Sequence, residues 1–210
     1  MKQFEAKMAE FTRMEMQTDL AHDFQHVLRV VKSARFLCAK EQGNSEVVMP
    51  AAWLHDCLTL DKDHPHRARS SQLAADKAIG FLSEIDYPKE YFEHIHHAIV
   101  AHSFSADITP QTIEASIVQD ADRLDALGAI GVARSIQVSA ALDRSLYCPE
   151  DPFCQSREPN DKVFTLDHFY QKLLLIGKSM GTDSAKREAI KRNDFMYQFI
   201  RQLRKEITLV

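Results

Sequence analysis

The chain has 210 residues, and its 45% of hydrophobic and 27% of charged side chains exclude an intrinsically disordered protein. A formal net charge of −4 argues against a broad electrostatic contact with long nucleic acid or with an anionic membrane. No apolar run approaches the roughly 18 residues of a membrane-spanning helix, and the charged N-terminus differs from a signal peptide. We therefore expect a cytoplasmic protein whose four cysteines stay reduced.

Apolar residues recur at helical spacing along most of the chain, and only 6 Gly and 7 Pro interrupt them. In one stretch Val27, Val31 and Cys38 share a stripe. Thr18 or Asp19 is the expected N-cap of that helix. The expected helices cover residues 4–16, 19–42, 45–54, 67–84, 88–102, 109–122, 165–180 and 182–207.

Residues 147–163 contain three prolines among mixed charges and form the one long loop that the sequence predicts. A loop of that length calls for a function, such as a lid or an interface arm. No segment shows the alternation of a strand, and no internal repeat is present. The predicted fold is all-α, with about eight helices in a single domain over residues 1–210. We expect its core at about residues 20–142, with the C-terminal helices, 165–207, packed on it.

Ten histidines are more than ordinary surface use requires, so their positions are informative. Together with aspartates they gather at residues 22–26, 55–56, 94–102 and 120–125. Imidazole and carboxylate groups are common ligands of divalent transition metals. Taken alone, each group also fits a structural role.

His55-Asp56 follows the apolar run AAWL, which we expect to be buried. A buried carboxylate costs free energy unless it is paired or bound to a metal. Adjacent residues within a helix point about 100° apart, but they can converge where the chain leaves the helix. The pair therefore fits either a His–Asp hydrogen bond at a helix end or two metal ligands.

His26 alone fits a polar helix face as well as a metal pair with His22, one turn earlier. The three aspartates between residues 120 and 125 interrupt an apolar helical stretch and cannot all face solvent. At least one of them is therefore buried or half-buried, where a carboxylate needs a cation. Arg123 or a metal ion would supply it.

The ordered set of His26, His55-Asp56 and Asp122 resembles the HD superfamily of metal-dependent phosphohydrolases. The likeness extends to the local sequences HDFQHVLRV, AAWLHDC and IVQDADRLDALGAIG, and to AIVAHSFS and DHFYQKLL further along. Within the superfamily, the chain is similar to small stand-alone bacterial proteins of the YpgQ and YedJ type, over roughly residues 20–205. The resemblance implies a helical bundle that forms one HD domain.

The resemblance implies that His26, His55, Asp56 and Asp122 bind one divalent metal. Mixed nitrogen and oxygen ligands suit Mn²⁺, our first expectation, as well as Fe²⁺, Co²⁺ or Zn²⁺, with Mg²⁺ and Ni²⁺ as further alternatives. Four protein ligands on an octahedral ion leave positions for water and for a phosphoryl oxygen. Additional histidines near His102 leave a second metal as an alternative.

Residues outside the metal ligands are expected to hold the phosphate and to transfer protons. Some HD nucleotidases carry an acidic pair shortly after the HD motif, whereas only Asp61 is acidic there in this chain. Asp61 and Lys62 are therefore the expected catalytic residues, with a histidine as the alternative proton donor. The expected substrate-binding residues are Arg29, Lys62, His66, Arg67, His102 and Arg123.

The function that the resemblance implies is cleavage of nucleoside or deoxynucleoside triphosphates to monophosphate and pyrophosphate. Alternatives within the same chemistry are a 5'-nucleotidase and a cyclic-nucleotide phosphodiesterase. Alternatives from other classes are a di-iron HD-fold oxygenase and a non-catalytic nucleotide sensor. The expected partner is a small phosphorylated substrate, without long nucleic acid or membrane, and the protein is expected to be a monomer or a homodimer.

Overall fold

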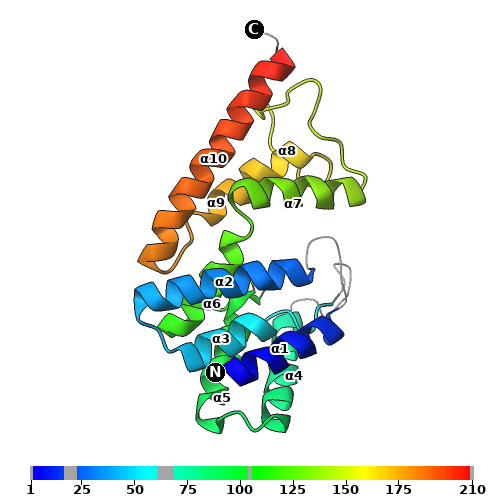
Figure 1. Cartoon of the computed structure of the whole chain (residues 1–210). Helices are drawn as coiled ribbons and strands as arrows, with labels where there is room; N and C mark the ends of the chain where they lie inside the picture. The colour runs from blue at the N-terminus through cyan, green and yellow to red at the C-terminus, as the bar shows by residue number, and fades with distance from the viewer. Residues whose placement is uncertain (1, 17–22, 61–68, 104–105, 209–210) are drawn as a thin grey trace. The chain divides into compact units, whose positions relative to one another are not determined.

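The structure is a computed structural model that describes residues 2–16, 23–60, 69–103 and 106–208 (Figure 1). Across those ranges the backbone is helical or irregular and forms no strand. Ser145 and Phe164 form an isolated bridge. The all-α class expected from the sequence is therefore confirmed.

The chain divides into two compact units. Unit 1 is Met1–Asp122 with Gly181–Ala185, and unit 2 is Arg123–Met180 with Lys186–Val210. The helices of unit 1 are α1 (Lys2–Glu15), α2 (Phe24–Glu41), α3 (Ser45–Leu54), α4 (Ser70–Glu84), the short 3-10 turn η2 (Lys89–Tyr91), α5 (Phe92–His102) and most of α6 (Ile113–Leu124). Those of unit 2 are α7 (Gly128–Ala141), α8 (Thr165–His168), the π-helical turn η4 (Phe169–Leu173), α9 (Leu174–Ile176) and most of α10 (Asp183–Thr208). The expectation of one domain, with its C-terminal helices packed on the core, stays a prediction.

Helix α3 is the centre of unit 1, where it contacts α1, α2, α4 and α5. It begins after Asn44, whose side chain accepts a hydrogen bond from the Glu46 N–H at 2.9 Å. Pro50 lies inside the helix and cannot donate to the Glu46 carbonyl one turn earlier. The hydroxyl of the buried Tyr87 donates to that carbonyl instead, at 2.8 Å. Residues 47–54 are all buried, so α3 is held on every side.

Helix α2 begins at Phe24, later in the chain than expected. The cap is the Asp23 side chain, which accepts from the His26 N–H at 2.8 Å. The expected caps, Thr18 and Asp19, lie outside the described residues. The consequence for the fold is that His26 lies in the first turn of α2.

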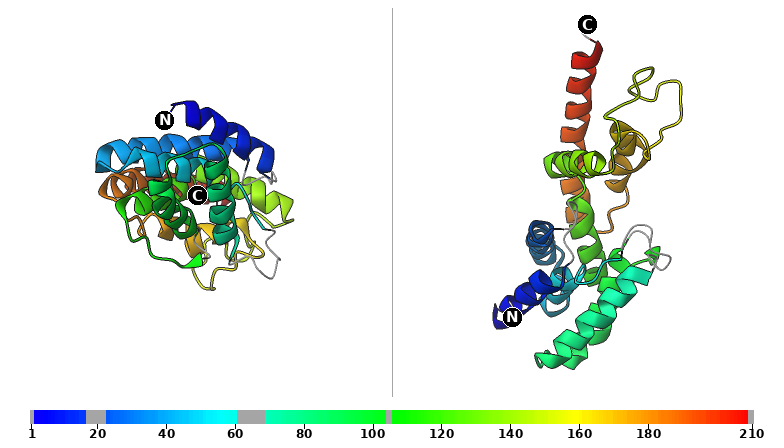
Figure 2. Two further views of the ribbon diagram at one scale, coloured as in Figure 1. Left: turned by 90° about the horizontal axis from the view of Figure 1, so that it is seen from below. Right: turned by 90° about the vertical axis from the view of Figure 1, so that its right-hand side faces the viewer.

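Helices α4 and α5 lie side by side in unit 1 (Figure 2). The buried face of α4 includes Ala74, Ala75 and Ala78, whose small side chains allow a close approach between helices. The expected helix over residues 88–102 is confirmed: it starts as the turn η2 and continues as α5, which ends at His102.

Helix α6 begins at Ile113 and not directly after Thr109. The reason is that the Thr112 hydroxyl oxygen accepts a hydrogen bond from the Ala115 N–H at 3.1 Å and so provides the cap. The helix then carries Asp120 and Asp122 toward its C-terminal end.

Asp120 is a buried structural carboxylate. Its oxygens accept hydrogen bonds from the Gly181 N–H at 2.9 Å and from the Thr182 N–H and hydroxyl, both at 2.7 Å. These bonds tie α6 to the turn that precedes α10. We expect Asp120→Ala to lower the free energy of unfolding by about 3 kcal/mol, because three donors, two of them buried on Thr182, lose their acceptor.

The Asp120→Ala effect is measured by urea denaturation. Asp120→Asn is the matched control, since its amide keeps one acceptor oxygen, and it should cost less than the alanine variant. Equal stability of Asp120→Ala and the wild type would contradict a structural role for this carboxylate.

Two glycines shape the start of α7 in unit 2. Gly128 has a φ of +69°, a left-handed conformation that side chains disfavour. At Gly131 a Cβ would lie 2.2 Å from the Ala126 carbonyl oxygen, so only glycine fits. Both glycines therefore lie where the chain breaks between α6 and α7.

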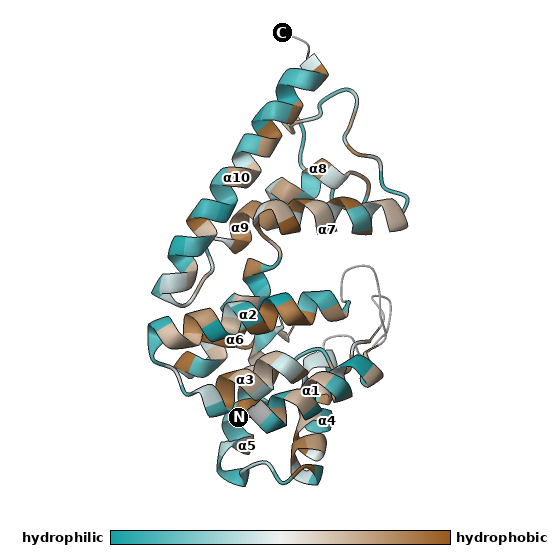
Figure 3. Ribbon diagram, in the orientation of Figure 1, coloured by the Kyte–Doolittle hydropathy of each residue, from teal (hydrophilic) through white to brown (hydrophobic). Residues whose placement is uncertain are grey.

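The C-terminal helix α10 is largely hydrophilic, with apolar residues spaced along it (Figure 3). Ala189, Met196 and Ile200 are buried at spacings of seven and four, which is one helical stripe. Within unit 2, Phe199 of α10 stacks on Phe169 with ring centroids 6.0 Å apart. The helical segment that carries Phe169 ends at Ile176, before the expected end at Met180.

The long loop over residues 147–163 is confirmed, and it is held by one buried carboxylate. Asp167 receives the Arg157 guanidinium on both oxygens, at 2.5 and 2.7 Å. The Asn160 N–H donates to it at 2.6 Å and the Cys154 thiol at 3.4 Å. The loop is therefore fixed in unit 2 by side chains from its own length.

This carboxylate predicts an acid limit to stability. Burial would raise the pKa of Asp167, but Arg157 and the Asn160 N–H hold it below its usual value. A depressed folded pKa stabilises the protein above the unfolded value of about 3.9, and that stabilisation is lost as the pH falls through the folded pKa. Asp167→Asn cannot lose this stabilisation. We therefore expect the variant to lose less stability than the wild type between pH 7 and pH values below about 4, as measured by pH-dependent circular dichroism.

None of the helices in the described ranges combines enough length with enough apolar character to cross a bilayer.

Candidate metal centre

Two helix ends of unit 1 bring histidines together. His26 lies in the first turn of α2, and His55 is the C-cap of α3. Both side chains are 1% exposed, and their ring centroids are 5.6 Å apart. The apolar neighbours of these helices exclude water from the rings, so polar ring nitrogens are buried there at a cost.

Asp56 is the carboxylate between the two histidines. Its Oδ2 lies 3.6 Å from His55 Nε2 and 3.8 Å from His26 Nε2. The two adjacent side chains converge because the chain leaves the helix at His55, as the sequence predicted. One ligand atom from each of the three residues lies within 4.8 Å of the other two, which is a spacing that could hold a metal ion.

Asp122, near the end of α6, is the second carboxylate of the centre. Its Oδ1 lies 3.3 Å from His26 Nε2. Burial would raise the pKa of Asp122, but the nearby imidazoles of His26, His55 and His102 hold the pKa below its usual value. Asp122 is therefore an anion at neutral pH and is available to a cation.

The protonation of His55 suits a metal ligand. Its Nδ1 lies 2.8 Å from the Ala52 carbonyl oxygen, and a carbonyl can only accept, so Nδ1 carries the proton. Burial lowers the pKa of His55, which favours the neutral ring with a lone pair on Nε2. That Nε2 is buried and makes no hydrogen bond within the described part of the chain. Metal-binding histidines commonly donate their other ring N–H to a backbone carbonyl in this way.

His102, the last residue of α5, borders the same centre. It is 7% exposed, its Nε2 lies 3.6 Å from Asp56 Oδ1, and its ring centroid lies 5.0 Å from that of His55. Its Nδ1 donates to the Ile99 carbonyl, three residues earlier, at 2.5 Å. Burial would lower the pKa of His102, but Asp56 and Asp122 raise it above its usual value.

Six further residues were expected to contact substrate or transfer protons. Asp61, Lys62, His66 and Arg67 lie outside the described residues. Arg29 is partly buried on α2, one turn after His26. Arg123 donates through Nη1 to the carbonyl and hydroxyl oxygens of Ser179, at 2.9 and 3.1 Å. Their expected roles toward substrate stay predictions.

Sequence reasoning missed the backbone carbonyls of Ala52 and Ile99, which orient His55 and His102. The usable signal is a histidine at the end of a helix, because its ring can reach the carbonyl three residues earlier. Both helices end at these histidines or directly before them.

A family model of the HD domain matches residues 23–127, which is half of the chain and spans His26, His55, Asp56 and Asp122. The chain therefore belongs to the HD-domain family, as its motifs implied.

Individual relatives match nearly the whole chain. The uncharacterized protein YpgQ of Bacillus subtilis is 34% identical over 212 residues, which cover 97% of this chain and 95% of YpgQ. The crystal structure of an HD-superfamily hydrolase from Bacillus thuringiensis is 35% identical, with a TM-score of 0.76 over 98% of this chain and 97% of that one. The crystal structure of YpgQ in complex with ADP is 30% identical, with a TM-score of 0.76 over 97% of each chain. The resemblance to stand-alone proteins of the YpgQ type is thus confirmed.

Proposed function

We propose that the chain is a metal-dependent phosphohydrolase that cleaves nucleoside or deoxynucleoside triphosphates to monophosphate and pyrophosphate. The observation that carries the proposal is the convergence of His26, His55 and Asp56, whose ligand atoms lie within 4.8 Å of one another. The adjacent Asp122 carboxylate adds a further oxygen ligand. Likeness to an HD-superfamily hydrolase supports hydrolysis, and the complex of YpgQ with ADP supports a nucleotide as the substrate.

The residues present fit one divalent cation. His26 and His55 would provide nitrogen ligands and Asp56 and Asp122 oxygen ligands, a mixed set that suits Mn²⁺. When bound, such a cation polarises a phosphoryl oxygen and lowers the pKa of coordinated water. The His55–Ala52 hydrogen bond orients the His55 ring for this task before any ligand arrives.

The chain's own side chains would bind the polyphosphate and transfer protons. We assign phosphate binding to Lys62, Arg67 and His66, which follow the HD motif, and proton transfer to Asp61. Arg29 would add positive charge one turn after His26.

We assign substrate contact to His102 as well. This is supported by its buried position beside the Asp56 carboxylate, with Nε2 at 3.6 Å from Oδ1. A histidine in that position could donate a hydrogen bond to a phosphoryl oxygen, and its pKa is raised by the two carboxylates.

The proposal is tested with a panel of nucleoside tri-, di-, mono- and cyclic phosphates, assayed with and without Mn²⁺. Pyrophosphate and orthophosphate are measured separately. Pyrophosphate from triphosphates, only in the presence of the metal, is the expected result. Orthophosphate from monophosphates would replace the proposal with a 5'-nucleotidase, and cleavage of cyclic nucleotides alone would replace it with a phosphodiesterase. Metal binding without any turnover would contradict hydrolysis.

Lys62→Ala should separate substrate binding from metal binding. We expect the variant to keep its Mn²⁺ affinity and to lose about 100-fold in kcat, because a cation that stabilises phosphoryl charge is removed. Isothermal titration with Mn²⁺ and steady-state kinetics measure the two effects. Lys32→Ala, at an exposed position of α2, is the matched control and should change neither. An unchanged kcat in Lys62→Ala would remove Lys62 from the site.

A further inference from the structure

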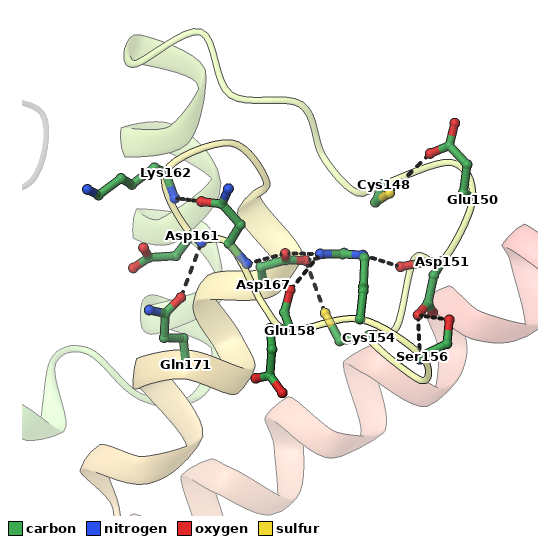
Figure 4. A network of polar contacts seen from close by, with 12 residues as sticks. Cys148, Glu150, Asp151, Cys154, Ser156, Glu158, Asp161, Lys162, Asp167 and Gln171 are labelled. Carbon is green, nitrogen blue, oxygen red and sulfur yellow. Dashed lines mark hydrogen bonds and ion pairs between the residues drawn. The ribbon is translucent and has the colours of Figure 1, made fainter.

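Unit 2 contains a histidine–aspartate pair of its own, outside the proposed metal centre. His168 Nδ1 lies 2.9 Å from Asp161 Oδ2, and because a carboxylate only accepts, Nδ1 carries the proton. The two side chains are 22% and 26% exposed, so the pair is reachable from solvent. The Asp161 N–H donates to Gln171 Oε1 at 3.2 Å (Figure 4), which fixes the carboxylate in front of the imidazole.

The loop that carries Asp161 is built to hold it there. Figure 4 shows the buried Asp167 at the middle of the polar network of this loop. Asp167 binds Arg157 and the Asn160 N–H, and it precedes His168 directly in the sequence. The same carboxylate thus fixes both the loop and the helix of the pair. The long loop that the sequence predicted thus positions Asp161 beside His168.

Lys172 and Arg144 lie near enough to His168 for their positive charges to lower its pKa. Lys172 follows His168 by four residues, about one turn along the same helical segment. Arg144 precedes Ser145, whose carbonyl oxygen accepts from the Thr165 N–H at 2.9 Å, so the backbone of Arg144 runs beside the start of that segment. The three basic groups therefore come from two stretches of unit 2 that are hydrogen-bonded to each other.

The imidazole of His168 offers an acceptor at neutral pH. Burial and the charges of Lys172 and Arg144 lower the pKa of His168, and they outweigh the opposite effect of Asp161. With the proton on Nδ1, the lone pair of Nε2 remains available. A ligand must then present negative charge to the two cations and a hydrogen-bond donor to Nε2.

We propose that His168, Lys172 and Arg144 form a binding site for a tetrahedral phosphate group that carries one P–OH, as inorganic phosphate or as the monoanion of a phosphate monoester. Hydrogen phosphate meets both requirements, because it is an anion that still carries one P–OH donor near neutral pH. Sulfate has the same shape and charge but no proton to donate. The site should therefore prefer phosphate to sulfate.

The test follows the imidazole signals of the full-length protein by nuclear magnetic resonance at pH 6, where inorganic phosphate and about half of a phosphate monoester carry a P–OH. The protein is titrated with inorganic phosphate, with adenosine monophosphate and with sulfate. His168→Gln assigns the signal. We expect saturable shifts of the His168 signal with phosphate and with the monoester, and binding of sulfate that is weaker by about tenfold or more. Tighter binding of the monoester would identify it as the source, and equal binding would identify the phosphate group alone as the determinant.

Charge variants locate the site. Lys172→Gln and Arg144→Gln should each weaken phosphate binding by about tenfold. Lys178→Gln, which removes the same charge at an exposed position further along, should leave it unchanged. Asp56→Ala should also leave it unchanged, which separates this site from the proposed metal centre. A His168 signal that phosphate does not move would overturn the proposal, as would equal binding of sulfate, or equal losses in Lys172→Gln and Lys178→Gln.

Discussion

Asp56→Ala is expected to remove divalent metal and turnover together while the protein stays folded. The Asp56 carboxylate lies 3.6 and 3.8 Å from the Nε2 atoms of His55 and His26, so it is the group shared by the proposed ligands. Without it, two neutral imidazoles and Asp122 remain, and a divalent cation keeps only one negative ligand. We expect Mn²⁺ affinity and kcat each to fall by more than about 100-fold. This loss is larger than that caused by mutating a residue that only hydrogen-bonds to a metal ligand.

The fold should tolerate this change. Asp56 is 13% exposed and lies at a helix end, so alanine leaves no large cavity, and a loss of about 1 kcal/mol is expected. Metal content after dialysis and Mn²⁺ titration calorimetry measure metal binding, steady-state kinetics measure kcat, and thermal unfolding measures stability. The matched control is Asp76→Ala, which removes a carboxylate 2.9 Å from His96 in the same unit and should change neither metal nor rate. Full metal content and full rate in Asp56→Ala would show that the ligands are assigned wrongly.

Arg157→Ala is expected to produce the largest stability loss among surface-accessible side chains of unit 2. Arg157 binds both oxygens of Asp167, a carboxylate that is 0% exposed. Removing the guanidinium leaves that charge buried, with the Asn160 N–H and the Cys154 thiol as remaining donors. Breaking a buried pair from one side costs about 3 kcal/mol or more, because the remaining charge is not compensated.

Urea denaturation followed by circular dichroism measures the effect of Arg157→Ala at pH 7. Arg201→Ala, at an exposed position of α10, is the control for the loss of an arginine and should stay within about 0.5 kcal/mol of the wild type. Arg157→Lys should recover only part of the stability, since a lysine cannot form the two-pronged contact. An Arg157→Ala protein that unfolds at the wild-type urea concentration would contradict the role of this pair.

The approximate positions of the helices could be predicted because the regularly spaced apolar residues of the sequence form the buried faces of the helices. The first residue of each helix could not. The helix expected from residue 109 starts later, after the cap Thr112, because several oxygen-bearing side chains lie close together in that stretch and only the backbone path decides which one accepts. The π-helical turn at Phe169–Leu173 has no periodic signal of its own. Pro50 is tolerated inside α3 because Tyr87, distant in the sequence, donates to the carbonyl that Pro50 leaves without its helical partner, and no local pattern reveals this contact.

The residues that converge at the candidate metal centre were easier to identify from the sequence than their surroundings. His55-Asp56 could be recognised as a candidate site from the sequence, because an acidic residue directly after a buried apolar helix needs a partner. His26, by contrast, also fitted a polar helix face, and only tertiary packing buries it. The Asp161–His168 pair escaped prediction because its partners are brought together by Asp167 and Arg157, whose contact is set by the fold of the loop.

The most direct test of the proposed activity is hydrolysis of a deoxynucleoside triphosphate by the Mn²⁺-loaded protein in ¹⁸O-labelled water, with both products examined by mass spectrometry. Attack on the α-phosphorus places one ¹⁸O atom in the monophosphate and none in the pyrophosphate, and this is the result we predict. Label in the pyrophosphate or in orthophosphate, or no turnover with the metal bound, would contradict a triphosphate pyrophosphohydrolase.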